Sequence, residues 1–212
     1  MQKLSALEIL SKLVSFPTVS NTSNLKLVDW VENYLLEFGI KSYRKYNSGG
    51  DKAALFAHVG PMKEGGVVLS GHTDVVPVEG QNWISDPWVL EEREGKYFGR
   101  GSCDMKGFDA LAIWAMVEAN EKGVTRPLQI ALSYDEEIGC LGAPPMIEEM
   151  LEKLPKASMV IVGEPSTMLP VTGHKGALGI KTHVIGKEVH SSILDRGVSA
   201  IMNAAKLIEW AN

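Results

Sequence analysis

The chain has 212 residues and a formal net charge of −5 at pH 7, with 45% hydrophobic and 22% charged residues. This composition is typical of a globular protein with a buried core, and it excludes a disordered or low-complexity chain. The negative charge and the lack of a basic run argue against nucleic acid or an acidic membrane as a partner.

Two cysteines, Cys103 and Cys140, lie too far apart in the sequence for a Cys-x-x-Cys site and are too few for a disulfide framework. Residues 1–16 have the pattern of an amphipathic helix, without the basic start and continuous apolar core of a signal peptide. No apolar stretch reaches the roughly 18 residues that a membrane span needs. We therefore expect a cytoplasmic protein with no membrane partner.

Apolar residues recur at helical spacing over residues 4–14 and 25–38, which predicts two helices at the start of the chain. Short apolar runs and helical patterns then alternate, interrupted by a long loop from His72 to Glu94. The alternation predicts an α/β fold with a mixed, mostly parallel sheet flanked by helices. The expected strands are Ala53–Val59, Val67–Ser70, Leu128–Tyr134 and Met159–Gly163, and the expected helices are Met105–Lys122 and Cys140–Lys153.

The pattern changes after about Gly173. A strand-like alternation covers Ile180–Ile185 and a helical pattern covers Val198–Trp210. One strand and one helix cannot bury a core of their own. We therefore predict two domains, residues 1–173 and the beginning of a second domain at residues 174–212.

Metal-binding residue types follow three of the predicted strands. His72 follows one strand, the Glu136-Glu137 pair follows another, and Glu164 follows a third. In such sheets, ligands bind beyond the carboxyl ends of the strands. Adjacent buried carboxylates repel each other, and a cation relieves that repulsion. The pattern predicts a two-metal hydrolase in which Glu137 holds metal and Glu136 moves protons.

Two further acids fit this site. Asp74 lies two residues after His72, so in an extended segment both point to the same side, and Asp74 can accept the second ring N–H. Asp104 lies between glycines at the start of a predicted helix, where one carboxylate could bridge two ions. Taken alone, His72 with Asp74 is more simply explained as a strand-end pair and Asp104 as an ordinary helix cap. The combination of these residues with the Glu pair and Glu164 indicates the metal site.

Six stretches of the sequence carry a resemblance to a known family: Ser70–Pro77, Val78–Trp83, Gly99–Gly107, Tyr134–Gly142, Gly163–Pro165 and Gly173–Gly176. Together they resemble the zinc-dependent amidohydrolase and exopeptidase superfamily, which includes aminoacylase, succinyl-diaminopimelate desuccinylase, carboxypeptidase G2 and acetylornithine deacetylase. The longer stretches are most similar to the acetylornithine deacetylase branch.

The resemblance implies a role for each residue. His72 and Glu164 would bind one metal ion, Glu137 would bind the other, and Asp104 would bridge them. Asp74 would orient His72. The ions would be Zn²⁺, with Co²⁺ or Mn²⁺ as alternatives for ligands of this type.

The resemblance also implies that Glu136 is the general base and that His190 stabilises the oxyanion in the partner's active site. Members of the family often have a cis peptide after the bridging acid, here Asp104-Met105. The first domain would then be catalytic and the second a lid and dimerisation domain.

The activity implied is hydrolysis of the N-acetyl amide of N2-acetylornithine in arginine biosynthesis, by a cytoplasmic homodimer. The family's second metal has a further His ligand near the end of a much longer chain, and no residue here matches it. We therefore expect the amino-terminal half of such an enzyme, inactive alone. The alternatives are another N-acyl amino acid deacylase, a desuccinylase, a dipeptidase, or an inactive metal-binding half-chain.

Overall fold

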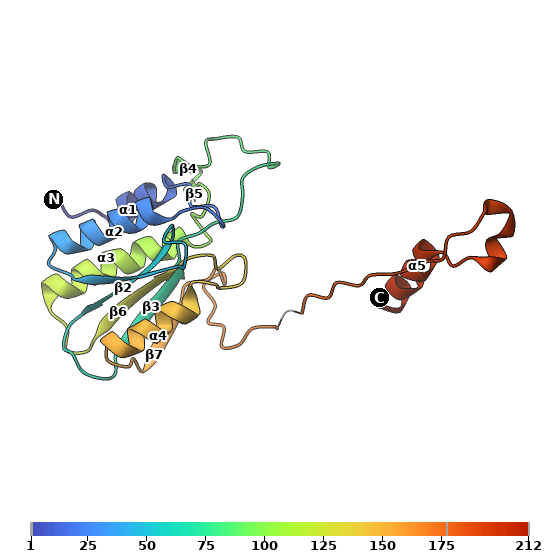
Figure 1. Ribbon diagram of the computed structural model, residues 1–212. Coiled ribbons are helices and arrows are strands. Elements are labelled where there is room, and N and C mark those ends of the chain that lie inside the picture. The colour runs from blue at the N-terminus through green and yellow to red at the C-terminus, as the bar shows by residue number, and fades with distance from the viewer. Residues whose placement is uncertain (1, 177, 212) are drawn as a thin grey trace. The chain divides into compact units, whose positions relative to one another are not determined.

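The computed structural model describes residues 2–176 and 178–211, which form two compact units, Met1–Leu169 and Pro170–Asn212. Figure 1 shows each unit as a ribbon. The division lies close to the predicted boundary between residues 173 and 174. The interpretation of the second unit as the beginning of a lid domain stays a prediction.

The first unit contains helices and strands in alternation. Its helices are α1 (Ala6–Val14), α2 (Leu25–Glu37), α3 (Lys106–Lys122) and α4 (Ala143–Lys153). Its strands are β1 (Ser42–Tyr46), β2 (Ala53–Val59), β3 (Val67–His72), β4 (Glu91–Arg93), β5 (Lys96–Phe98), β6 (Leu128–Ser133) and β7 (Met159–Val162).

Five strands form one mixed sheet in the order β1-β2-β6-β3-β7. Strands β6, β3 and β7 run parallel, and β2 runs antiparallel to both of its neighbours, β1 and β6. The register pairs His72 of β3 with Ser133 of β6, so the two strands end at the same edge of the sheet. The predicted mixed α/β sheet is confirmed.

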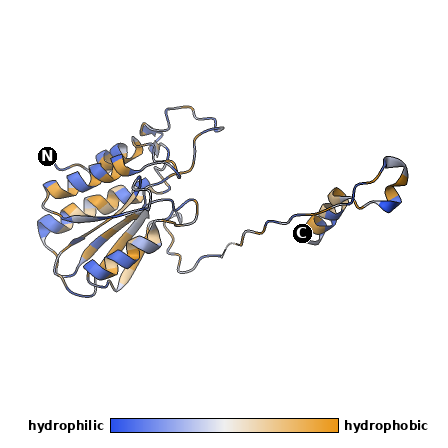
Figure 2. Cartoon of the chain, in the orientation of Figure 1, coloured by the Kyte–Doolittle hydropathy of each residue, from blue (hydrophilic) through white to orange (hydrophobic). Residues whose placement is uncertain are grey.

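Helices cover both faces of this sheet (Figure 1). Helices α1, α2 and α3 share one hydrophobic core with the sheet, and α4 packs on a second core. Strand β2 contributes to both cores, because Leu55 and Ala57 belong to the first core while Ala54 and Phe56 belong to the second. Figure 2 shows the hydrophobic residues that run along the strands and one side of these helices.

Local chemistry sets the helix starts. Ser5 and Glu8 form a reciprocal capping box at the start of α1. The predicted helix from Cys140 begins instead at Ala143, because prolines are tolerated only in a first turn and Pro144 and Pro145 occupy that turn. Strand β1 and the β4–β5 hairpin near the end of the long loop were not predicted from the sequence.

The second unit contains the short helix η1 (Ser191–Arg196) and α5 (Ala200–Ala211). The helix predicted at Val198–Trp210 is present and starts at Ala200. The strand predicted at Ile180–Ile185 was wrong: these residues have no secondary structure and no strand partner. Their alternation matches a strand, but a strand also needs a partner for its backbone hydrogen bonds. No helix in the described residues is long and apolar enough to cross a membrane.

Candidate metal centre

The predicted ligands lie together at one edge of the sheet, beyond the carboxyl ends of its parallel strands. His72 ends β3, Glu136 and Glu137 follow β6, Glu164 follows β7, and Asp104 lies just before α3. The Nε2 atom of His72 is 3.2 Å from Asp104 Oδ1, 3.6 Å from Glu164 Oε1 and 3.7 Å from Glu136 Oε2. Parallel strands that end in register explain this convergence.

These side chains form two groups of three, and the ligand atoms of each group lie within 4.8 Å of one another. His72, Glu136 and Glu164 make one group, and His72, Asp104 and Glu137 make the other. Imidazole and carboxylate donors at this spacing fit Zn²⁺, Co²⁺ or Mn²⁺. His72 belongs to both groups, and it is the one histidine in either of them among the described residues.

The electrostatics of the cluster favour a cation. Burial raises the pKa of Glu137, and the negative charge of Asp104 raises it further. Burial also raises the pKa of Glu164; protonated His72 opposes this, while Asp104 and Glu136 add to it. These acids therefore hold their negative charges at a cost, and a divalent ion among them would remove that cost.

The His72 ring is fixed in an orientation that suits metal binding. Its Nδ1 lies 2.9 Å from the backbone carbonyl oxygen of Asp74 and 3.4 Å from the Asp74 carboxylate. A carbonyl oxygen can only accept, so Nδ1 carries a hydrogen and Nε2 faces the acids. Burial lowers the pKa of His72, but the bond to Asp74 and the charges of Asp74, Asp109 and Glu164 raise it to about 10.

The Asp74 carboxylate has a second role, which the sequence did not suggest. It accepts hydrogen bonds from Ser20 Oγ at 2.7 Å, from the backbone N–H of Glu136 at 3.0 Å and from that of Glu137 at 3.3 Å. Burial raises the pKa of Asp74, but the bonds to His72, Glu136 and Ser20 outweigh burial and lower it. The ionised Asp74 carboxylate therefore lies 3.4 Å from His72 Nδ1 and accepts the backbone N–H groups of the Glu pair.

A family model described as Peptidase family M20/M25/M40 matches residues 68–212, a range that contains both ligand groups. The chain belongs to peptidase family M20/M25/M40. The acetylornithine deacetylases of Pasteurella multocida and Myxococcus xanthus are 36% and 35% identical to this M20 chain, over 209 and 205 residues. The alignments cover 95% and 94% of this chain but 54% and 52% of the relatives. The chain thus spans about half the length of these relatives.

Solved structures share the fold of the M20 chain. An M20 family metallo-carboxypeptidase from Sulfolobus solfataricus matches with a TM-score of 0.66 and 20% identity, over 76% of this chain and 37% of that protein. Human carnosine dipeptidase 1 matches with a TM-score of 0.63 and 21% identity, over 74% of this chain and 37% of that protein. At such identities the likeness shows the fold alone.

One expectation that came from the resemblance has a structural counterpart in the M20 chain. The Asp104-Met105 peptide is cis. His190 lies in the second unit, where its Nδ1 accepts the backbone N–H of Ser192 at 3.2 Å and caps η1. The catalytic role of His190 stays a prediction.

Two buried charged residues of α3, Lys106 and Asp109, were not predicted from the sequence. Lys106 is buried, and its Nζ donates to the carbonyl oxygen of Phe16 at 2.7 Å. Burial lowers the pKa of Lys106 to about 7, although the charges of Asp109 and Asp74 oppose the shift. Asp109 is also buried, and burial raises its pKa well above the usual value. Both lie on the apolar stripe of α3 that includes Ile113, and charges on a core-facing stripe are a signal that the sequence does carry.

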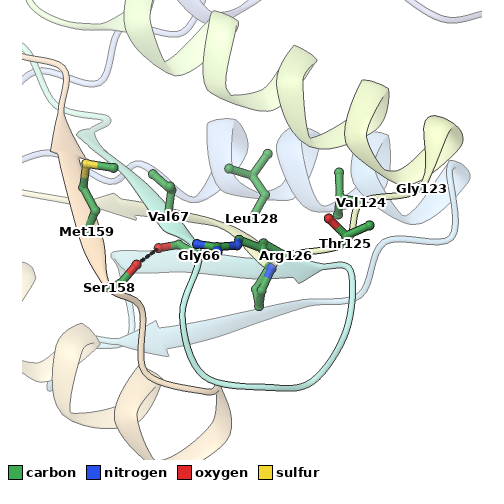
Figure 3. Close-up of a pocket in the computed structure, with 10 residues that line it drawn as sticks. Gly66, Val67, Gly123, Val124, Thr125, Arg126, Leu128, Ser158 and Met159 are labelled. Carbon is green, nitrogen blue, oxygen red and sulfur yellow. Dashed lines mark hydrogen bonds between the residues drawn. The ribbon is translucent and has the colours of Figure 1, made fainter.

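The opposite edge of the sheet holds a pocket of about 580 Å³ (Figure 3). The first residues of β3, β6 and β7 line it, so it lies at the amino ends of the strands. Ser158 Oγ donates to the Gly66 carbonyl oxygen at 2.9 Å on its wall. Arg126 is the one charged side chain among its lining residues, and no metal-ligating type is present there. The pocket is therefore separate from the candidate metal centre.

Proposed function

We propose that this M20 chain carries the metal-binding and proton-transfer residues of a hydrolase that cleaves the N-acetyl amide of N2-acetylornithine to ornithine and acetate. The observation that carries the proposal is the convergence of His72 with acids from three separate segments at one sheet edge. The substrate rests on the relatives, which are acetylornithine deacetylases with 34–36% identity.

The proposed ligands divide between two ions. His72 and Glu164 would hold one ion, Glu137 would hold the other, and Asp104 would be shared between them. Zn²⁺ is the first candidate, with Co²⁺ or Mn²⁺ as alternatives. Bound ions of this kind polarise an acyl carbonyl and make a water molecule acidic.

Glu136 is the proposed general base. Its Oε2 faces the Nε2 side of His72 at 3.7 Å, its side chain is about one-third exposed, and Cys140 Sγ lies 3.5 Å from its Oε1. Glu136 takes a proton from the attacking water as the oxygen bonds to the acyl carbon. It then gives that proton to the amide nitrogen as the carbon–nitrogen bond breaks, which releases acetate and the free amine.

The test compares two neighbouring substitutions in the natural full-length protein. Glu136→Gln should keep two ions per chain and lower kcat by about 10²–10⁴-fold. Glu137→Gln, the matched control, should lose one ion. Elemental analysis and steady-state rates check both. Turnover near wild type in Glu136→Gln would exclude Glu136 as the base.

The alternative substrates need their own comparison. Side-by-side rates on N-acetylornithine, N-succinyl-diaminopimelate and N-acetylmethionine separate a deacetylase from a desuccinylase or another acylase. A chain that binds fewer than two ions and hydrolyses none of these would instead be a metal-binding half-chain. The bond between Glu136 and Asp74 favours the enzyme, because it holds the proposed base next to the ligands.

The cellular setting is proposed on the same basis. A deacetylase of this substrate would act in arginine biosynthesis in the cytoplasm, and the full-length protein would be a homodimer. In that dimer, His190 would stabilise the oxyanion in the partner's site. His190→Ala should then lower kcat with little change in KM, whereas His183→Ala should leave both unchanged.

A further inference from the structure

A buried ion pair joins Lys52 to Asp135, the residue that directly precedes the Glu pair of the candidate metal centre. Lys52 Nζ is 2.5 Å from Asp135 Oδ2, and both side chains are only 8% exposed. The topology explains the pairing: β2 runs antiparallel to β6, with Leu55 opposite Leu132. Continuing that register by three residues places Lys52 opposite Asp135. The strand that runs against the others thus delivers a lysine to the edge where the parallel strands end.

Asp135 is the residue at which the chain turns from β6 into the Glu pair. Its φ is +53°, in the left-handed region that residues other than glycine seldom adopt. Asp135 Oδ1 accepts the backbone N–H of Asn21 at 3.1 Å, and Oδ2 accepts from Lys52. Both carboxylate oxygens are therefore held while the backbone turns.

The turn at Asp135 sets the direction of the next two peptides. The N–H groups of Glu136 and Glu137 both point to the Asp74 carboxylate. After the turn, the backbone N–H of Leu141 returns to the Asp135 carbonyl oxygen at 3.1 Å. The positions of Glu136 and Glu137 thus depend on the conformation that Asp135 keeps.

We propose that Lys52 is a positioning residue of the metal centre: acting through Asp135, it fixes the turn that places Glu136 in one ligand group and Glu137 in the other. The inference rests on the proposed function in that it takes Glu137 as a metal ligand and Glu136 as the base beside the bound ions. A lysine that only stabilised the fold would leave metal affinity and coordination unchanged in the folded protein.

The experiment uses the natural full-length protein, with Co²⁺ as the probe. Lys52→Met is titrated with Co²⁺ and its visible spectrum, which reports coordination geometry, is compared with wild type. Lys52→Arg is the conservative variant. Lys45→Met is the matched control, because Lys45 of β1 in the same sheet pairs with Glu149 of α4 at 3.1 Å, and its side chain is 39% exposed.

We expect Lys52→Met to bind Co²⁺ at least tenfold more weakly with an altered spectrum, and Lys52→Arg to recover most of the affinity. Lys45→Met should match wild type. An unchanged affinity and spectrum in Lys52→Met, with only a lower melting temperature, would overturn the proposal. If Lys52→Met does not fold, Lys52→Met/Asp135→Asn replaces it, since it leaves no unpaired buried charge, and the same two outcomes apply.

Hydrolysis is measured separately from these titrations. A wild-type protein that binds Co²⁺ but cleaves no N-acyl amino acid would contradict the proposed function. The Co²⁺ titration of the Lys52 variants would still decide whether Lys52 positions the metal-binding residues. A wild-type protein that binds no Co²⁺ would overturn both.

Discussion

The Asp74 carboxylate accepts the backbone N–H of Glu136, with 3.0 Å between Oδ1 and nitrogen. This bond joins the loop after β3 to the loop after β6, so His72 and the Glu pair share one support. Ser20 reaches the same carboxylate from the segment after α1. Three segments far apart in the sequence therefore meet at a carboxylate that is not assigned to the metal.

Asp74→Asn should lower the stability of the protein by more than the loss of any one of these hydrogen bonds would. An amide offers one acceptor oxygen and turns two donors toward groups that also donate, which leaves buried N–H groups unpaired. We expect a loss of about 1–3 kcal/mol in the free energy of unfolding and about 10–100-fold weaker metal binding. Urea unfolding and metal titration measure these effects.

Ser20→Ala is the control for Asp74→Asn. It removes one donor to Asp74 but leaves the carboxylate and both backbone bonds, so its cost should be about 0.5–1.5 kcal/mol. If the two variants bind metal equally well, Asp74 does not hold the Glu pair in the way described.

Metal binding should release a proton from His72. In the metal-free chain the neighbouring acids raise the pKa of the ring to about 10, so Nε2 is protonated at neutral pH and must lose its proton to ligate. We expect about one proton released from this ring per chain at pH 7, and metal affinity that rises with pH by about tenfold per unit between pH 7 and 9.

Calorimetric titrations in buffers of different ionisation enthalpy measure that proton. The exposed His183 gives the control, because His183→Ala should release the same number of protons as wild type. Binding that is independent of pH over this range would show that the ring is neutral before the metal arrives.

The convergence of the ligands could be predicted from the sequence because it follows from local signals. Short apolar runs mark β3, β6 and β7, and an acid or a histidine follows each run directly. The support behind the ligands could not be predicted, since it depends on long-range pairing. Nothing near Ser20 indicates that it meets Asp74, and nothing near Lys52 indicates that it meets Asp135.

The burial of Asp109, by contrast, could have been predicted, because the sequence places this acid on the core-facing stripe of α3. A carboxyl group on the buried stripe of α3 loses its hydration, and its Oδ1 has no hydrogen-bond partner among the described residues. Burial raises its pKa well above 3.8, so the folded state favours the protonated form. The stability that this group contributes is complete below about pH 4 and is lost as the pH rises through the folded pKa.

Asp109→Asn should remove that loss, because the amide stays neutral at every pH. In the metal-free chain we expect the variant to match wild type near pH 4 and to become the more stable of the two as the pH rises toward 8. Urea unfolding at a series of pH values tests this. Asp195→Asn, at an exposed position, should show a constant difference from wild type; the same flat result for Asp109→Asn would mean that Asp109 is not buried as an acid.

Two consecutive glycines lie at the edge of the sheet opposite the candidate metal centre, just before β3. Gly65 and Gly66 have nearly equal φ angles, +94° and +91°, so alanine is strained at both positions. A Cβ on Gly65 would meet nothing within 4 Å, whereas one on Gly66 would lie 2.1 Å from the Pro127 carbonyl oxygen. The Gly66 carbonyl also accepts two bonds from Ser158, which leads into β7 and so to Glu164.

Gly65→Ala should therefore cost about 1–2 kcal/mol from backbone strain alone, and Gly66→Ala should cost about 1–3 kcal/mol more because the backbone at Pro127 must move. The same movement displaces β7, so Gly66→Ala should also weaken metal binding through Glu164, while Gly65→Ala should not. Unfolding and metal titration of both variants measure this. Equal stability of the two variants would show that the start of β3 does not pack against Pro127, and the link from this edge to Glu164 would then fail.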